Sequence, residues 1–430
     1  MKVTYDISVL SHGYRSDPAR TGIFRVIDRT AKGLQSRADV ELQLSSAESW
    51  ENHYWAGRFL EDEATQGRNM LAPGGPLAAG LYHAQDFLYG PGAAVRKSSV
   101  GRAATRIVRR VSGALTSRTS PLRRSALTGR DIFHSGFHAF PDTTLHVKGL
   151  RRFVTVYDLI PVLFPEFFAE GISVIIRELF LEMLRSIGPD DYVLAISEAT
   201  RRDLCAYLPI DPARVFVAPL AASENLFYPV TNCEEIASTR ARYGIPIDAV
   251  YLLSVNTLEP RKNMAHALRC FAEVLQESGI PDLYFVLVGT RGWDFQGILN
   301  TIADSKLIGD RVILAGFVPD EELAALYSGA LAFVYPSHYE GFGLPPLEAM
   351  QCGTPVITSN TSSLPEVVGD AGIMISPTDS DALSQAMLAM YQQPSLRSVM
   401  EAHSLARSAE FSWTRYTDDV VRSYRTALRN

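Results

Sequence analysis

Short apolar runs alternate with amphipathic segments along most of the chain. The first pair is an apolar run at 3–10, followed by 21–34 (TGIFRVIDRTAKGL), in which Ile23, Ile27 and Leu34 share one helical face. Later strand-like runs lie within 131–140, 151–161, 191–204, 215–220, 250–255, 283–288, 312–314 and 331–335. Apolar strands that alternate with helices predict parallel sheets with helices on both faces, which is the α/β class.

Polar residues follow several of these runs in the first half of the chain. His134, Asp158 and Ser197 each come at or near the end of an apolar run, and His138 and Tyr157 lie close by in sequence. Open α/β sheets bind ligands beyond the carboxyl ends of their strands. We therefore expect the residues at these strand ends to face a binding site.

The stretch 335–348 (YPSHYEGFGLPPLE) predicts a strand, a glycine-rich turn and the start of a helix. Unpaired backbone amides at 341–344 and the helix dipole suit an anionic ligand. The carboxylates of Glu340 in the turn and Glu348 in the first helical turn can accept hydrogen bonds from the hydroxyls of a ribose or a hexose. The structural alternative is that Glu348 only stabilises its helix start, worth about 0.3–1 kcal/mol. That alternative leaves Glu340 and the two glycines unexplained.

A second candidate lies in 253–263 (LSVNTLEPRKN), where Arg261 and Lys262 follow a strand and Pro260. Adjacent cations at that place can neutralise a departing diphosphate. A pair of basic residues is more often a solvated surface feature, but its position behind a strand end favours a function.

Together, 335–348, its continuation to 372 and the segment 253–263 resemble the E-x7-E and donor-phosphate motifs of the GT-B retaining glycosyltransferases of family 4. The similarity extends to the branch of bacterial polysaccharide mannosyltransferases. The resemblance implies two Rossmann-like domains that face a central cleft. Residues 1–230 would bind the acceptor and 231–410 the nucleotide-sugar, while a final helix at 411–430 would pack back on the first domain.

The resemblance also implies roles for individual residues. Arg261 and Lys262 would contact the diphosphate, Glu340 the donor sugar and Glu348 the ribose. The full set expected at the donor comprises Gly22, Asn256, Arg261, Lys262, Val318, Glu340, Gly341, Phe342, Gly343, Leu344 and Glu348.

The chain departs from the family pattern at two places. Asn256 stands where the family more often has glycine, and Tyr157-Asp158 where many relatives carry His-Asp. Asp158 is therefore the expected catalytic residue on the acceptor side. Arg261, Lys262 and Glu340 are the expected catalytic residues on the donor side. On the acceptor side Tyr157, His134 and His138 are the alternatives, and the structural alternative for Asp158 itself is that it only caps the turn before Pro161.

The length of 430 residues suggests two domains of about 200 residues each. The four cysteines show no metal-binding spacing. Asp379-Ser380-Asp381 has the D-x-D spacing of some metal sites, but it opens an amphipathic segment and predicts a helix cap. We expect no metal and no cofactor beyond the nucleotide-sugar substrate.

Charge is uneven along the chain. The net charge of −6 argues against nucleic-acid binding, yet residues 96–130 contain ten Lys and Arg and no acid. The segment predicts a basic amphipathic helix, with Arg102, Arg106, Arg109 and Arg110 largely off its apolar face. It indicates peripheral contact with an anionic membrane surface, and the alternative is an ordinary solvated helix face. Without a signal peptide or an apolar run of about 18 residues, a cytoplasmic location is expected.

These features predict an enzyme that moves a hexose, with retention, from a nucleotide-diphosphate sugar to a saccharide or lipid-linked saccharide acceptor. GDP-mannose is the favoured donor and a UDP-sugar the next, in the assembly of cell-surface polysaccharide such as lipopolysaccharide. The alternatives are a GT-B nucleotide-sugar epimerase, which needs no acceptor, and a non-catalytic nucleotide-sugar-binding protein.

Overall fold

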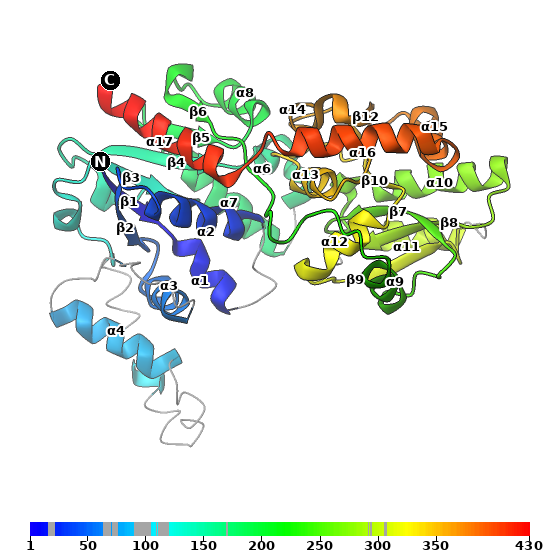
Figure 1. Cartoon of the computed structure of the whole chain (residues 1–430). Coiled ribbons are helices and arrows are strands. Elements are labelled where there is room, and N and C mark those ends of the chain that lie inside the picture. The colour runs from blue at the N-terminus through cyan, green and yellow to red at the C-terminus, as the bar shows by residue number, and fades with distance from the viewer. Residues whose placement is uncertain are drawn as a thin grey trace. The chain divides into compact units, whose positions relative to one another are not determined.

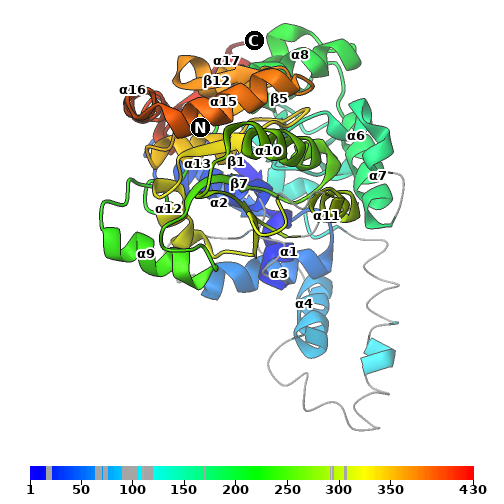
Figure 2. The same ribbon diagram turned by 90° about the vertical axis from the view of Figure 1, so that its right-hand side faces the viewer.

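The computed structural model describes residues 1–15, 22–62, 70, 76–89, 105–108, 110, 120–168, 171–290, 292, 295–304 and 308–430. The chain forms two compact units (Figure 1, with a second view in Figure 2). Unit 1 contains Met1–Ala195, Arg201–Ala218 and Thr417–Asn430, and unit 2 contains Ile196–Thr200 and Pro219–Tyr416. Each unit is built on one six-stranded sheet, which confirms the α/β class.

The sheet of unit 1 is parallel throughout, in the order β2-β1-β3-β4-β5-β6. Its strands are β1 Lys2–Asp6, β2 Glu41–Ser45, β3 Ile132–Ser135, β4 Arg151–Val156, β5 Tyr192–Ala195 and β6 Val215–Val217. The helices here are α1 Ser8–Arg15, α2 Gly22–Gln35, α3 Trp50–Asp62, α4 Pro76–Tyr89, α6 Ile160–Leu163, α7 Ile172–Arg185 and α8 Glu198–Tyr207. The first three residues of α8 count with unit 2.

The sheet of unit 2 is also parallel, in the order β12-β11-β10-β7-β8-β9. Its strands are β7 Val250–Val255, β8 Leu283–Val288, β9 Val312–Gly316, β10 Ala332–Tyr335, β11 Val356–Ser359 and β12 Gly372–Ile375. Its helices are α9 Cys233–Arg242, α10 Met264–Ser278, α11 Phe295–Asp304, α12 Asp320–Ser328, α13 Leu344–Gln351, α14 Leu364–Val368, α15 Ser380–Gln392 and α16 Pro394–Ser408.

Both strand orders reverse direction at an internal strand. In unit 1 the chain passes from β1 to β2 on one side and then to β3 on the other. In unit 2 it passes from β7 through β8 and β9 and then returns to β10 on the opposite side of β7. Such a reversal opens a crevice beyond the carboxyl ends of the two strands, and open α/β sheets bind ligands there.

The strands are apolar because both sheets are covered on both faces. In unit 1, Phe133, Val154 and Val193 on adjacent strands are fully buried in one cluster. In unit 2, Leu252 and Phe285 belong to a similar cluster under α10 and α15. Continuous apolar runs are therefore needed in place of the alternating pattern of a half-exposed sheet.

The last helix, α17 Trp413–Arg429, packs on unit 1 from Thr417 onward. It approaches α2 so closely that a Cβ atom at Gly33 would lie 2.2 Å from Thr417 Oγ1. Arg151 Nε also donates to the carbonyl of Ala427 at 3.2 Å. The expected return of the C-terminal helix to the first unit is therefore confirmed.

The basic segment 96–130 lies mostly outside the described residues. Of it, the structure describes only 105–108, 110 and 120–130, and the first of these stretches is helical. Arg106 and Arg110 are exposed there, whereas Arg102 and Arg109 lie outside the described part. Among the described helices, none is both long and apolar enough to cross a bilayer.

Candidate active site

The candidate site of unit 2 lies where the strand order reverses, beyond the ends of β7 and β10. After β7 the chain enters a single 3-10 turn, Pro260–Lys262, and after β10 it forms the loop 336–343 before α13. The two segments are joined directly, because the amide of His338 donates to the carbonyl of Arg261 at 2.9 Å. Side chains separated by almost eighty positions in the sequence therefore meet at one place.

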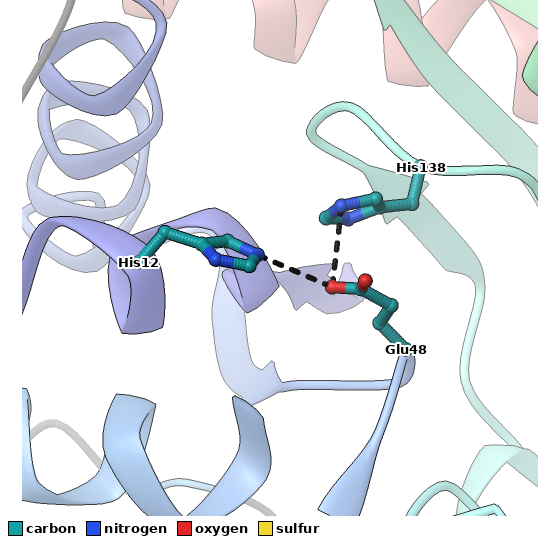
Figure 3. Close-up of side chains that lie close together, drawn as sticks. All are labelled: His12, Glu48 and His138. Atoms are coloured by element: carbon teal, nitrogen blue, oxygen red, sulfur yellow. Dashed lines mark ion pairs between the residues drawn. The ribbon is translucent and has the colours of Figure 1, made fainter. Parts of the chain in front are cut away.

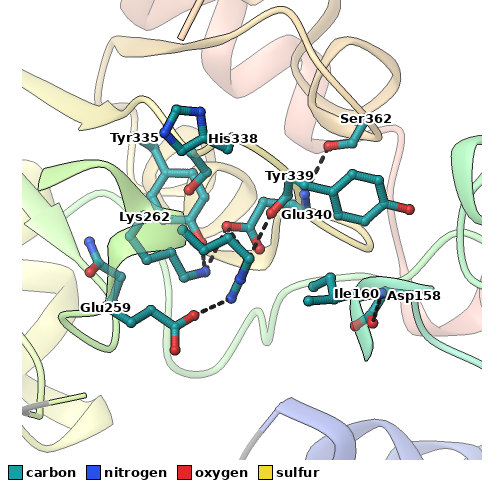
Figure 4. A network of polar contacts seen from close by, with 12 residues as sticks. Asp158, Ile160, Glu259, Lys262, Tyr335, His338, Tyr339, Glu340 and Ser362 are labelled. Carbon is teal, nitrogen blue, oxygen red and sulfur yellow. Dashed lines mark hydrogen bonds and ion pairs between the residues drawn. The ribbon is translucent and has the colours of Figure 1, made fainter. Parts of the chain in front are cut away.

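A buried ion cluster occupies that place (Figure 4). Glu340 Oε1 lies 2.7 Å from Lys262 Nζ and 3.0 Å from a terminal nitrogen of Arg261. Lys262 Nζ also donates to the hydroxyl of Tyr335 at 2.6 Å, and Arg261 pairs with Glu259 at 2.6 Å. Only 7% of Lys262 and 8% of Glu340 is exposed. Two cations and two carboxylates thus balance each other, with Lys262 and Glu340 buried and Arg261 and Glu259 partly exposed.

The cluster keeps Glu340 ionised. Burial by itself would raise the pKa of this carboxyl, but the adjacent charges of Arg261 and Lys262 outweigh it and lower the pKa to about 2. Burial and the neighbouring Arg261 lower the pKa of Lys262, against the opposing attraction of Glu340. The Tyr335 pKa is raised well above its ordinary value, chiefly by burial. At neutral pH Glu340 can therefore accept hydrogen bonds from hydroxyls but has no proton to donate.

Hydrogen bonds fix the backbone on both sides of Glu340. Its amide donates to Ser362 Oγ at 2.9 Å, and its carbonyl accepts from Ser363 Oγ at 2.9 Å. Arg261 also donates to the carbonyl of Tyr339 at 2.7 Å. Figure 4 shows the hydrogen bond between the Glu340 amide and Ser362 as a dashed line. The carboxylate is thus held in place before any ligand binds.

Glu348 is the second carboxylate of the motif. It lies in α13, is 6% exposed, and accepts a hydrogen bond from the hydroxyl of Tyr327 at 3.2 Å. The helix follows Gly343, whose φ of 116° is a conformation that favours glycine. Two prolines stand in the first turn of α13, as the sequence predicted. The structure therefore has the strand, glycine turn and helix that the sequence pattern predicted. The placement of Glu348 in the first helical turn is wrong, because α13 begins at Leu344 and Glu348 is its fifth residue.

The other residues expected at the donor are distributed as follows. Gly341 and Phe342 lie in the loop before α13, Leu344 is its first residue, and Phe342 packs edge-on against Phe411. Val318 is buried just before α12. Gly22 belongs to unit 1, where it is exposed at the start of α2.

Asn256 stands directly after β7 and fits without backbone strain. The backbone angle φ of Asn256 is not positive, so a side chain is tolerated here. The close approach is made instead by Gly289, where a Cβ atom would lie 1.8 Å from the Asn256 carbonyl oxygen. The Asn256 side chain donates to Ser254 Oγ at 2.8 Å, and its own oxygen is buried without a hydrogen-bond partner among the described residues.

At the carboxyl ends of the unit 1 strands, Tyr157 and Asp158 follow β4. The Tyr157 hydroxyl donates to the carbonyl of Gly136 at 3.0 Å, and the ring is buried. Asp158 is partly exposed and accepts from the amide of Ile160 at 2.9 Å (Figure 4). The turn contact engages Oδ1, so the capping alternative for Asp158 has a real structural basis.

His134 lies in the core of unit 1. The residue is fully buried within β3, and its ring nitrogens lie 2.5 Å from the Tyr424 hydroxyl and 2.8 Å from Thr155 Oγ1. Burial lowers its pKa to about 3, so the ring is neutral. This placement gives His134 a packing role, whereas His138 lies in the loop after β3.

Some members of the cluster gave no signal in the sequence. Tyr335 is the last residue of an ordinary apolar run, and Ser362 and Ser363 lie more than twenty residues beyond Glu340. Glu259 was detectable in principle, since it precedes Arg261 by two positions.

Asp379 caps α15 by accepting from the amide of Ala382 at 3.0 Å, which confirms the interpretation of that D-x-D spacing.

Two parallel α/β units, with this loop and helix in the second, are the arrangement of GT-B glycosyltransferases, and solved structures agree. The Anabaena protein HepE in complex with UDP and glucose has a TM-score of 0.64 at 16% identity, over 99% of this chain and 100% of that one. A family model, "Glycosyl transferases group 1", matches residues 235–406.

Curated relatives identify the family. O-antigen chain mannosyltransferase B of Escherichia coli is 33% identical over 303 residues, which are 70% of this chain and 77% of that protein. The serotype-specific mannosyltransferase WbdA of the same species is 31% identical over 278 residues, 64% of this chain but 33% of that longer protein. The chain belongs to the group 1 glycosyltransferases and is an enzyme that transfers sugars.

Proposed function

We propose that the enzyme is a retaining mannosyltransferase that takes mannose from GDP-mannose and extends a saccharide or lipid-linked saccharide during cell-surface polysaccharide assembly. The observation that carries the proposal is the Glu340 cluster. It places an ionised carboxylate, which can accept hydrogen bonds from sugar hydroxyls, beside two fixed cations at the strand reversal of unit 2. The mannosyltransferase relatives support the choice of sugar.

In this proposal unit 2 binds the donor. Arg261 and Lys262 stabilise the negative charge that develops on the departing diphosphate, as fixed cations in a buried site do most effectively. Glu340 accepts hydrogen bonds from hydroxyls of the donor sugar, and Glu348 accepts hydrogen bonds from hydroxyls of the ribose. Because two cations already stand at the leaving group, transfer itself needs no metal ion.

Unit 1 binds the acceptor in the same scheme. Asp158, beyond the end of β4, accepts the hydrogen bond of the attacking hydroxyl or stabilises positive charge at the anomeric carbon. Tyr157 is a weaker candidate, since its hydroxyl is already used on a backbone carbonyl. Retention of configuration rests on the likeness to the family.

A UDP-sugar is the second candidate donor, because solved proteins of the same fold have been captured with UDP. The epimerase and the non-catalytic alternatives are not favoured, since the named relatives are glycosyltransferases. We further propose that the enzyme works on the cytoplasmic face of a membrane, with the basic segment 96–130 contacting anionic lipid. That step rests on the composition of the segment.

The test is a transfer reaction with a panel of nucleotide-sugars and a synthetic α-mannoside that carries an apolar aglycone. The proposal predicts release of GDP and growth of the acceptor with GDP-mannose, faster than with any UDP-sugar. The anomeric configuration of the product, determined by NMR, is expected to match that of the donor. Turnover of a UDP-sugar alone would reassign the donor, and donor conversion without an acceptor would favour the epimerase.

A further inference from the structure

A second cluster of ligand-type side chains lies in unit 1, outside the proposed donor site. His12 in α1, Glu48 between β2 and α3, and His138 after β3 point toward one another (Figure 3). The three follow β1, β2 and β3, which are neighbours in the sheet, and they lie at its strand reversal. Three separate segments therefore bring two imidazoles and one carboxylate to the edge where this fold binds ligands.

The spacing of the three ligand atoms matches a small cation. Glu48 Oε2 lies 3.2 Å from His138 Nε2 and 3.7 Å from His12 Nε2, and all three atoms lie within 4.8 Å of one another. A tetrahedral ion that holds nitrogen and oxygen at about 2.0–2.2 Å keeps adjacent ligand atoms about 3.3–3.6 Å apart. The two separations from Glu48 lie just outside that range, one on either side.

The neighbouring amide of Asn52 indicates which atoms of His12 and Glu48 are available to a cation. Asn52 donates through Nδ2 to Glu48 Oε2, and the same Nδ2 lies 3.4 Å from His12 Nε2. A proton on His12 Nε2 would point at the amide hydrogens, so the compatible tautomer has its lone pair there. With its lone pair there, His12 Nε2 cannot hydrogen-bond to Glu48 Oε2, 3.7 Å away, because both atoms are acceptors. The two acceptors thus share the Asn52 amide as their donor, and a cation held by both atoms would replace those two hydrogen bonds.

The surrounding backbone is fixed in advance. Asp6 Oδ1 accepts from the amide of Ala47 at 3.1 Å and from Ser8 Oγ at 2.7 Å, which ties the Glu48 segment to the start of α1. Ser135 Oγ donates to the carbonyl of His138 at 2.6 Å. Ligands held by such outer contacts, as Glu48 is also held by Asn52, lose little freedom when a metal binds.

We propose that His12 Nε2, Glu48 Oε2 and His138 Nε2 form a binding site for a divalent transition metal of the zinc type. Two histidines and one glutamate make up a known zinc ligand set that leaves the fourth position for water or another oxygen ligand. His12 and Glu48 are exposed, so an ion can reach them from solvent. The site shares no residue with the proposed donor set, and metal-independent transfer at those residues does not conflict with it.

The experiment uses the full chain without an affinity tag, freed of metal by dialysis against a chelator and titrated with Zn²⁺ in a calorimeter. We expect one Zn²⁺ per chain, and Co²⁺ in its place should give the intense visible absorption of four-coordinate cobalt. His12→Gln and Glu48→Gln are expected to weaken Zn²⁺ binding by at least about 100-fold, because a lost ligand costs more than the 10–100-fold of a lost outer contact.

Two controls keep the test specific. His403→Gln removes an exposed histidine from α16 of unit 2 and is expected to leave Zn²⁺ binding unchanged. His12 is an exposed side chain, so His12→Gln is expected to fold normally, with the melting temperature as the check. Absence of one-to-one Zn²⁺ binding, or equal affinity in the wild type and His12→Gln, would overturn the site. GDP binding to the same proteins is measured separately, so failure of one proposal is not failure of the other.

Discussion

Replacing Glu340 by glutamine tests whether the buried ion cluster is as strongly coupled as its geometry indicates. The change keeps the shape of the side chain and removes its charge, so Arg261 and Lys262 lose their shared partner. The fall of the Glu340 pKa from 4.5 to about 2 corresponds to about 3 kcal/mol of stabilisation. Breaking a buried ion pair from one side typically costs about 3–5 kcal/mol, which agrees in size.

The pH dependence provides the sharper part of this prediction. Because folding lowers the pKa of Glu340, its contribution is complete above the unfolded value of 4.5 and is lost as pH falls toward about 2. Protonated Glu340 resembles glutamine. The difference in free energy of unfolding between wild type and Glu340→Gln should therefore be constant from pH 6 to pH 8 and should fall by more than half by about pH 3.

Differential scanning calorimetry of the full chain measures this effect. For a unit of about 200 residues, a loss of about 3 kcal/mol lowers the melting temperature by about 6–12 °C. Glu401→Gln, on the exposed surface of α16, is the matched control and should change stability by less than about 0.5 kcal/mol. A Glu340→Gln protein that melts like the wild type at pH 7, or a difference that persists unchanged to pH 3, would refute the reasoning.

Three further predictions concern turnover and the core of unit 1. Arg261→Ala and Lys262→Met should each lower kcat/KM for the donor by about 10²–10³-fold, and wild-type kinetics in both would remove the diphosphate assignment. Asp158→Asn should keep its melting temperature and GDP affinity while turnover falls by about 10²-fold or more. Near-normal activity would show that Asp158 only stabilises the turn and takes no part in transfer. His134→Ala should cost about 1–3 kcal/mol of stability for each polar partner left unpaired, Tyr424 among them, with kcat of the folded protein unchanged. A selective loss of kcat in that variant would return His134 to the acceptor site.

The architecture could be predicted because apolar runs of strand length leave few alternatives. Fully buried parallel strands need continuous apolar sequence, and the runs at 151–161, 250–255 and 331–335 each contain a strand of the two sheets. Predicting that Lys262 meets Glu340 required more than local patterning. Their contact depends on β7 and β10 being neighbours, and the likeness of the motifs to a known family assigned both residues to the donor site without predicting that they pair.

Other features could not be read from the sequence, for physical reasons. His134 follows an apolar run just as a ligand-binding residue would, and its burial depends on Tyr424, which lies 290 positions later in α17. The cluster of His12, Glu48 and His138 depends on the order β2-β1-β3, which local patterns do not specify. The basic segment 96–130 remains a prediction from composition, since most of it lies outside the described residues.

The most direct test of the central claim is calorimetric titration of GDP and GDP-mannose into the wild type and Glu348→Ala. The account assigns Glu348 to the ribose, so this variant should bind both ligands more weakly, by about 1.5–3 kcal/mol, the range for a hydrogen bond to a charged group. Glu340→Gln should keep its affinity for GDP, since Glu340 is assigned to the sugar. Wild-type protein that binds neither ligand, or a Glu348→Ala protein that binds both as tightly as the wild type, would contradict the account.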